Sequence, residues 1–196
     1  MSDIFAEPDD AATPLSAEEI RDLIPSYIAY RRELNLAEQE NIARGQEWAL
    51  RRRRPGLLSE KFIKDLHRHM FGDVWRWAGS FRTSERNLGV EHWEIATSLR
   101  MLLDDCKAWI EHKTYRPDEI AVRVHHRLVQ IHPFPNGNGR HARLMADLLV
   151  VQLGGARFTW GSGSLGDPGA LRKRYVEALR AADAHNLGPL LAFARS

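Results

Sequence analysis

Two helical segments rich in apolar residues are separated by a short break of proline and glycine, and this pattern constrains the fold more than any other feature. Residues 120–131 and 144–149 both carry apolar side chains at the spacing of a single helical face. The first helix is predicted to end at His132, because Pro133 disfavours helical geometry in the residue that precedes it. Pro133 and Pro135 stiffen the loop, so the imidazole of His132 is expected to be held in place.

The other segments with helical periodicity make the predicted fold class mainly α: a helical bundle with one short β-hairpin. Residues 75–90 lose the helical pattern and indicate the loop or hairpin. Start and stop signals bound the remaining helices. Ser16 with Glu19 opens a short helix before Pro25, Asn35 with Glu38 starts one that runs to about Arg52, Ser59 and Gly72 bound a third, residues 93–112 form another, Pro117 begins the next, and a last long helix covers about Pro168 to Ala184.

Composition favours a single globular domain. The chain has 196 residues, of which 43% are hydrophobic and 28% charged, enough to bury a core. Its 28 basic and 26 acidic residues give a net charge of +2, so nucleic acid is not the expected partner. The one cysteine, Cys106, cannot form an intramolecular disulfide, which favours a reducing, cytoplasmic compartment. No secretory signal is visible at residues 1–10, and no apolar run reaches the length of about 18 residues that a membrane span needs.

The break between the two apolar helices combines groups that bind anions. Gly137 and Gly139 let the backbone curl and expose N–H groups at the start of the next helix, where the helix dipole also favours phosphate. Arg140 and Arg143 are three residues apart, so both side chains project from one helical face and can bind anionic oxygens. Phe134 is expected to anchor the loop in the core. The sequence therefore predicts an anion site with a fixed histidine at its rim.

The string from His132 to Arg143 resembles the signature of the Fic (Fic/Doc) family, His-x-Phe-x-Asp/Glu-Gly-Asn-Gly-Arg-x-x-Arg, at every defined position except one. Residues 77–82, Trp-Ala-Gly-Ser-Phe-Arg, look like the entry to the flap hairpin of the family, and residues 175–193 resemble its closing helices. The similarity covers roughly Leu34 to the C-terminus and implies a helical Fic fold. The implied division is 1–32 for a lead-in and short helix, 33–54 for an inhibitory helix, and 55–196 for the Fic domain.

The resemblance implies adenylylation, in which AMP passes from ATP to a hydroxyl side chain of a target protein and pyrophosphate leaves. His132 would be the general base that takes the proton from the attacking Ser, Thr or Tyr hydroxyl, since imidazole titrates near neutral pH. Five residues would cradle the phosphates and neutralise the charge of the leaving pyrophosphate. These nucleotide-binding residues are Gly137, Asn138, Gly139, Arg140 and Arg143.

The implied partner is a protein that carries a hydroxyl, and self-modification is included. The flap would hold a segment of that target by adding it as a strand to a sheet edge. The flap residues are Phe81, Arg82, Thr83, Ser84, Asn87, Leu88 and Gly89.

Asn136 is the one departure from the signature. It stands where the family has the acidic residue that binds Mg²⁺ beside the phosphates. Magnesium prefers hard oxygen ligands, usually one or two carboxylates with several waters. Because an amide oxygen brings no negative charge, Asn136 is a weak candidate ligand, and a different metal demand or a changed reaction stays open.

A polar pair upstream resembles a second element of the family. Glu40 and Asn41 fit the end of the inhibitory helix pattern Ser/Thr-x-x-x-Glu-Gly/Asn, with Leu36 where Ser or Thr is expected. Helical spacing predicts that both lie on the packing face of their helix. The resemblance implies that the glutamate pairs with Arg143 and keeps ATP out of its productive pose. The amino-acid sequence of residues 33–42 also resembles that of the branch called mobile mystery protein B.

Three other functions stay open at this point. The same fold could remove AMP from a target, or transfer another phosphate-containing group from another nucleotide. It could be a catalytically silent nucleotide-binding module, with Asn136 as the lesion. The run from Arg51 to Arg54 could bind DNA, although a solvated helix end fits the same residues. Packing or solvent roles are expected for His125, His126 and His141.

Overall fold

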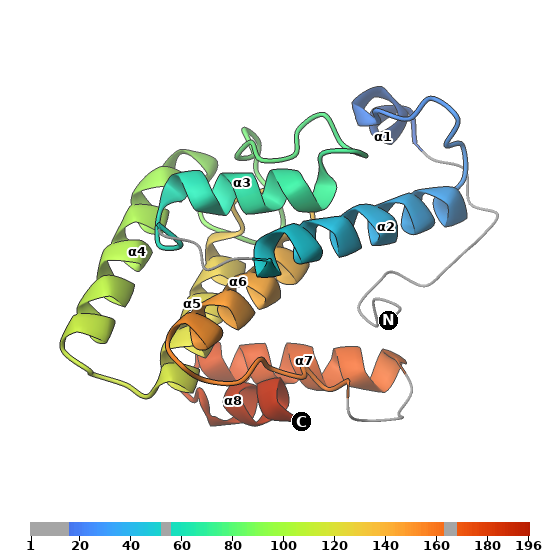
Figure 1. Ribbon diagram of the computed structural model, residues 1–196. Coiled ribbons are helices and arrows are strands. Elements are labelled where there is room, and N and C mark those ends of the chain that lie inside the picture. The colour runs from blue at the N-terminus through green and yellow to red at the C-terminus, as the bar shows by residue number, and fades with distance from the viewer. Residues whose placement is uncertain (1–15, 52–55, 163–167) are drawn as a thin grey trace. The chain divides into compact units, whose positions relative to one another are not determined.

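The protein is mainly helical in the ranges that the structure, a computed structural model, describes: residues 16–51, 56–162 and 168–196 (Figure 1). The predicted helical class is therefore confirmed. The elements are α1 (Ala17–Asp22), α2 (Arg31–Leu50), α3 (Glu60–Phe71), the 3-10 turn η1 (His92–Glu94), α4 (Ile95–Glu111), α5 (Pro117–Ile131), α6 (Asn138–Gln152), α7 (Pro168–Asp183) and α8 (Gly188–Arg195). Among the described residues, no helix combines the length and apolar character needed to cross a membrane.

The described residues form two compact units. The first contains the chain up to Arg82 together with Phe134–Gly137, and the second contains Thr83–Pro133 and Asn138–Ser196. In the first unit, α2 and α3 pack side by side (Figure 1). Gly45 of α2 permits this close approach, since a Cβ atom there would lie 2.8 Å from the carbonyl oxygen of His69.

The predicted ends of α3 are confirmed, whereas the predicted start of α2 is wrong. Ser59 caps α3 by accepting a hydrogen bond from the Phe62 N–H at 3.2 Å, and Gly72 follows its last residue. The helix α2 begins at Arg31, not after Asn35, because Glu33 reaches back and accepts from the Ala29 N–H at 2.8 Å. The expected partner of Asn35, Glu38, is instead buried and accepts from the indole N–H of Trp75 at 2.6 Å.

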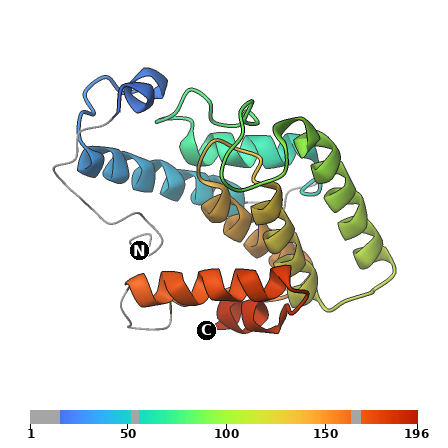
Figure 2. The ribbon, with the colours of Figure 1, turned by 180° about the vertical axis from the view of Figure 1, so that it is seen from behind.

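In the second unit, α5 and α6 lie side by side, and α7 packs along α8 (Figure 2). Pro117 opens α5 as predicted, since its missing N–H has no partner to lose in a first turn. A buried carboxylate, Asp147, ties α6 to the segment after it by accepting from Trp160 Nε1 at 3.0 Å and Arg157 Nη2 at 3.1 Å. Because α5 and α6 pack together and only a short loop connects them, the last residue of α5 and the first residue of α6 lie at the same end of the two helices.

The predicted β-hairpin flap is not formed. In the part of the chain that the structure describes, strand-type pairing is limited to an isolated bridge between Leu23 and Trp75, outside the expected flap. Residues 83–89 are exposed and contain bends but no regular strand. A two-stranded hairpin without a third strand or a packed apolar face is marginal in water, and this segment is mostly polar.

Candidate functional site

His132 lies at the C-terminal end of α5 in a left-handed conformation, with φ 52° and ψ 58°. Its N–H donates to the carbonyl of Leu128 at 3.1 Å and closes the helix, so the predicted helix end is confirmed. Its side chain is half-buried. A non-glycine residue in this region of backbone space is uncommon and costs energy, and such residues gather at functional sites.

The flap residues adjoin this histidine in the second unit. The N–H of Val90, directly after the flap, donates to the carbonyl of Ile131 at 3.4 Å. The segment from Thr83 to Gly89 is exposed, whereas Phe81 is half-buried and Arg82 is buried in the first unit. Seven exposed residues therefore end one hydrogen bond away from the residue before His132.

In the first unit, the loop residues 134–137 are held by aromatic rings. Phe134 is completely buried, and its ring stacks on His67 with 3.7 Å between the ring centroids. The ring of Phe81 lies against the same phenylalanine at 5.8 Å. The prediction that Phe134 anchors the loop is confirmed.

Sequence analysis missed His67, which fixes the backbone of this loop. Its Nδ1 accepts from the Gly79 N–H at 3.0 Å, so the neutral ring carries its proton on Nε2 and donates to the carbonyl of Asn136 at 3.0 Å. The ring is fully buried. The available signal was its place on the apolar face of α3, one turn after Ile63.

Gly137 is required by both its conformation and its surroundings. Its φ is +77°, and a Cβ atom there would lie 2.4 Å from the ring of Phe71. The preceding Asn136 is exposed, and its Oδ1 accepts from the Gly137 N–H at 2.6 Å. The expectation that both glycines curl the backbone holds for Gly137 but is wrong for Gly139, which lies inside α6 without a positive φ.

The loop is a poor fit for Mg²⁺. Asn136 offers one neutral oxygen that already accepts a backbone hydrogen bond, whereas magnesium is usually bound through carboxylates. In the ranges that the structure describes, no group of three or more His, Cys, Asp or Glu residues could hold a metal ion. The side chains therefore give no charged ligand at the predicted position.

The start of α6 presents the predicted anion-binding groups in the second unit. Asn138 is the first residue of the helix and is buried, and Gly139 and Arg140 behind it are half-buried. The first turn of α6 contains no acidic residue, so the positive end of the helix dipole is not neutralised there. Arg143 follows one turn later, half-buried, with its guanidinium carbon 5.7 Å from the ring centroid of Tyr175.

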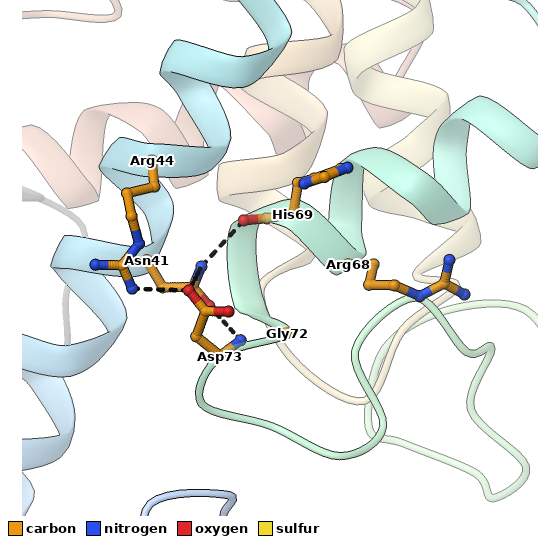
Figure 3. A pocket seen from close by; sticks show the side chains of 6 residues that line it. All are labelled: Asn41, Arg44, Arg68, His69, Gly72 and Asp73. Atoms are coloured by element: carbon orange, nitrogen blue, oxygen red, sulfur yellow. Dashed lines mark hydrogen bonds and ion pairs between the residues drawn. The ribbon is translucent and has the colours of Figure 1, made fainter.

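Glu40 and Asn41 do not share a packing face, and this part of the prediction is wrong. Asn41 is buried, whereas Glu40 is exposed. The amide of Asn41 joins α2 to the end of α3: it donates to the carbonyl of His69 at 3.0 Å and accepts from the Asp73 N–H at 2.9 Å (Figure 3). Arg44 pairs with the Asp73 carboxylate at 2.8 Å. The face that packs is the one with Leu34, Glu38 and Asn41 on it, since a helix turns 100° per residue.

Two further predictions are not tested by the structure. Of the basic run, Arg51 pairs with Glu47 at 2.7 Å, and Arg52 to Arg54 lie outside the described residues. The pairing of Glu40 with Arg143 joins residues of different units and stays a prediction.

Comparison with known proteins identifies the domain. Residues 57–150 match the model of the Fic/DOC family. Curated relatives named "Protein adenylyltransferase Fic" are 33% identical in Aedes aegypti and 35% identical in Drosophila melanogaster, over 98 residues. These matches cover 48% of this chain but only 20% of each relative, so the chain spans about a fifth of their length.

Solved structures agree with the fold. Fic-1 from C. elegans is 27% identical with a TM-score of 0.64, and the match covers 81% of this chain and 48% of that one. BepC from Bartonella tribocorum, solved with AMPPNP bound, is 18% identical with a TM-score of 0.69, over 88% of this chain and 89% of that one. Together with the family match over residues 57–150, these similarities show that the chain contains a domain of the Fic/DOC family.

Proposed function

We propose that the protein is an adenylyltransferase that moves AMP from ATP to a Ser, Thr or Tyr hydroxyl of a protein. The observation that carries this proposal is the arrangement at the end of the α5–α6 pair. His132 ends one helix in a left-handed conformation, and the next helix begins six residues later with an uncompensated N-terminus and two arginines one turn apart. The Fic/DOC family model matches this part of the chain, and the similar curated proteins carry the name of this activity.

Each side chain has one task in the proposed reaction. The N–H groups at the start of α6, around Asn138 and Gly139, bind phosphate oxygens, and Arg140 and Arg143 balance the negative charge of the departing pyrophosphate. His132 accepts the proton of the attacking hydroxyl as its oxygen bonds to the α-phosphorus. The bond from that phosphorus to the β-phosphate oxygen then breaks, and pyrophosphate leaves with the bond electrons.

Magnesium, which the resemblance implies, would shield the charge of the ATP phosphates when bound. Asn136 is the residue placed to contribute, and it supplies no charge, so no step of the proposal depends on the metal. The flap residues, with Leu88 exposed, are proposed to contact the target segment. The compartment is proposed to be cytoplasmic, and the branch within the family to be mobile mystery protein B, on the wording of residues 33–42.

Autoinhibition by Glu40 is part of the same proposal. Its exposed carboxylate is available for a cationic partner, and the buried Asn41 beside it fixes the rotation of α2 against α3. A carboxylate on Arg143 would compete with the γ-phosphate for the same guanidinium. Glu40→Gly should therefore raise transfer, and Arg143→Ala in the same background should cancel the gain.

Mass spectrometry of the purified Glu40→Gly protein, after incubation with ATP, CTP, GTP or UTP, tests the activity. We expect the mass of AMP to be added with ATP. His132→Ala should reduce that rate by about 10²–10⁴-fold, the usual contribution of a general base, while ATP affinity stays nearly unchanged. The exposed His112, changed to alanine, is the matched control and should keep the full rate. ATP binding without any added mass would favour the silent module, and retention of more than about a tenth of the rate in His132→Ala would refute the general base.

A further inference from the structure

Arg143 lies against the ring of the buried Tyr175, which is hydrogen-bonded with a buried histidine, and the proposed reaction uses neither the tyrosine nor the histidine. The hydroxyl of Tyr175, on α7, lies 3.1 Å from Nε2 of His125, on α5. Both side chains are buried, His125 completely. All three residues belong to the second unit, and we call them the Tyr175 cluster.

The pKa shifts determine the charge of each group in this cluster. Burial first, and then the charge of Arg143, lower the pKa of His125 to about 3, so the imidazole is neutral at physiological pH. Burial raises the pKa of Tyr175, although the charge of Arg143 and a hydrogen bond with it act in the opposite direction. The phenol therefore keeps its proton, and the Tyr175 hydroxyl is hydrogen-bonded with Nε2 of His125 at 3.1 Å. Its oxygen lone pairs are left to accept from the guanidinium.

The surroundings argue against a role in packing alone. A phenylalanine would fill the same volume, yet the chain places a hydroxyl where it must be desolvated, and this is costly unless the group is hydrogen-bonded. The hydroxyl also lies at the start of α6: a Cβ atom on Gly139 would be 3.8 Å from it. Tyr175 thus lies near both the helix N-terminus and the second arginine of the site.

We infer that Tyr175, backed by His125, is a positioning residue that fixes the guanidinium of Arg143 in one orientation for the phosphates of the nucleotide. This inference rests on the proposed function for its ligand, but the orientation of Arg143 is a property of the protein itself. An arginine side chain loses much rotamer freedom when it binds an anion, and orienting it beforehand lowers that cost.

The test compares Tyr175→Phe with Tyr115→Phe. The control is well matched, because the Tyr115 ring also lies against a guanidinium, that of Arg123, at 4.1 Å, on a different part of the second unit. We expect kcat/KM for ATP to fall about tenfold in Tyr175→Phe, the effect of one lost hydrogen bond to a charged group, and to stay unchanged in Tyr115→Phe. In an Arg143→Ala background, Tyr175→Phe should have no further effect, since the coupled partner is gone.

A second measurement separates this inference from the proposed function. The Nε–H signal of Arg143 in NMR spectra should be sharp and protected from exchange in the wild type, and broadened or shifted in Tyr175→Phe only. If that signal is the same in both proteins, or if Tyr175→Phe lowers kcat/KM equally with and without Arg143, the inference is wrong. If the Glu40→Gly protein transfers no AMP while the Arg143 signal responds as expected, the proposed function fails and the positioning stands.

Discussion

The two halves of the signature loop are held in different ways. Residues 134–137 are fixed by ring stacking on His67, by one hydrogen bond to a backbone carbonyl and by the absence of a side chain at Gly137. Residues 138–143 are part of a regular helix, and Arg143 among them lies against Tyr175, which is hydrogen-bonded with His125. The first half is thus determined by volume, and the second by charge and hydrogen bonds.

This difference determines which changes each half tolerates. A close-packed contact fails when atoms are added, because the surroundings cannot move aside without loss elsewhere. When one atom of a polar contact is removed, the surrounding packing is preserved, and only the hydrogen bond that oriented the side chain is lost. We therefore expect changes in the first half to affect stability, and changes in the second half to affect binding and pH dependence.

The largest effect is expected from Gly137→Ala. The new methyl group would lie 2.4 Å from the Phe71 ring at a φ of +77°, and overpacking with an unfavourable φ should together cost about 2–4 kcal/mol. Gly154→Ala is the control, because that glycine has a φ of +90° with nothing within 4 Å. Urea unfolding of both variants separates the clash from the backbone strain. Equal losses would show that packing against Phe71 does not hold the loop.

A smaller loss is expected from His67→Leu. Leucine preserves an apolar contact but leaves the buried Gly79 N–H without its acceptor, at a cost of about 1–3 kcal/mol. The carbonyl of the exposed Asn136 also loses its donor but can bind water instead. His69→Leu on the same helix is the control, since that side chain is exposed. The temperature of thermal unfolding and the rate of AMP transfer should both fall in His67→Leu and stay unchanged in His69→Leu. A His67→Leu protein with normal transfer would mean that the loop backbone is held by Phe134 alone.

Local signals predicted much of this fold, but the partners of the site residues could not be predicted. Ser59, Gly72 and Pro117 act within a few residues of the helix ends that they set, so the sequence contains the whole cause. The start of α2 was missed because Glu33 caps it from inside the helix. His67 and Tyr175 owe their roles to residues 69 and 50 positions away, which no local pattern contains.

The free energy of unfolding should depend on pH through His125, which supports the second half of the loop. Its folded pKa of about 3 lies below the usual value of 6.5, so the unfolded chain takes up a proton first as the pH falls. Stability is fully present above pH 6.5 and is lost between pH 6.5 and 3, by up to about 1.4 kcal/mol for each pH unit. Burial raises the pKa of Asp147, which acts in the opposite sense.

Unfolding free energies measured between pH 7 and pH 4 should therefore fall less steeply in His125→Gln than in the wild type. The control is His112→Gln, at an exposed position on the same unit. Identical slopes in all three proteins would mean that burial does not lower the pKa of His125, and that this imidazole can be protonated in the folded state.

The smallest effect on the fold, and the sharpest test of the boundary between the halves, is expected from Asn136→Asp. The carboxylate can still accept from the Gly137 N–H, so the free energy of unfolding should change by less than about 1 kcal/mol. It also adds the charged ligand that Mg²⁺ prefers, so the Mg²⁺ concentration for half-maximal transfer should fall several-fold. Asn186→Asp is the matched control, because the Asn186 side chain accepts from the Gly188 N–H in the same way and the variant adds the same charge. Only the loop variant should shift the metal dependence. If neither variant shifts the metal dependence, position 136 does not contribute a metal ligand. Asn136 would then serve only to accept the Gly137 N–H, and residues 138–143 would bind the nucleotide without its help.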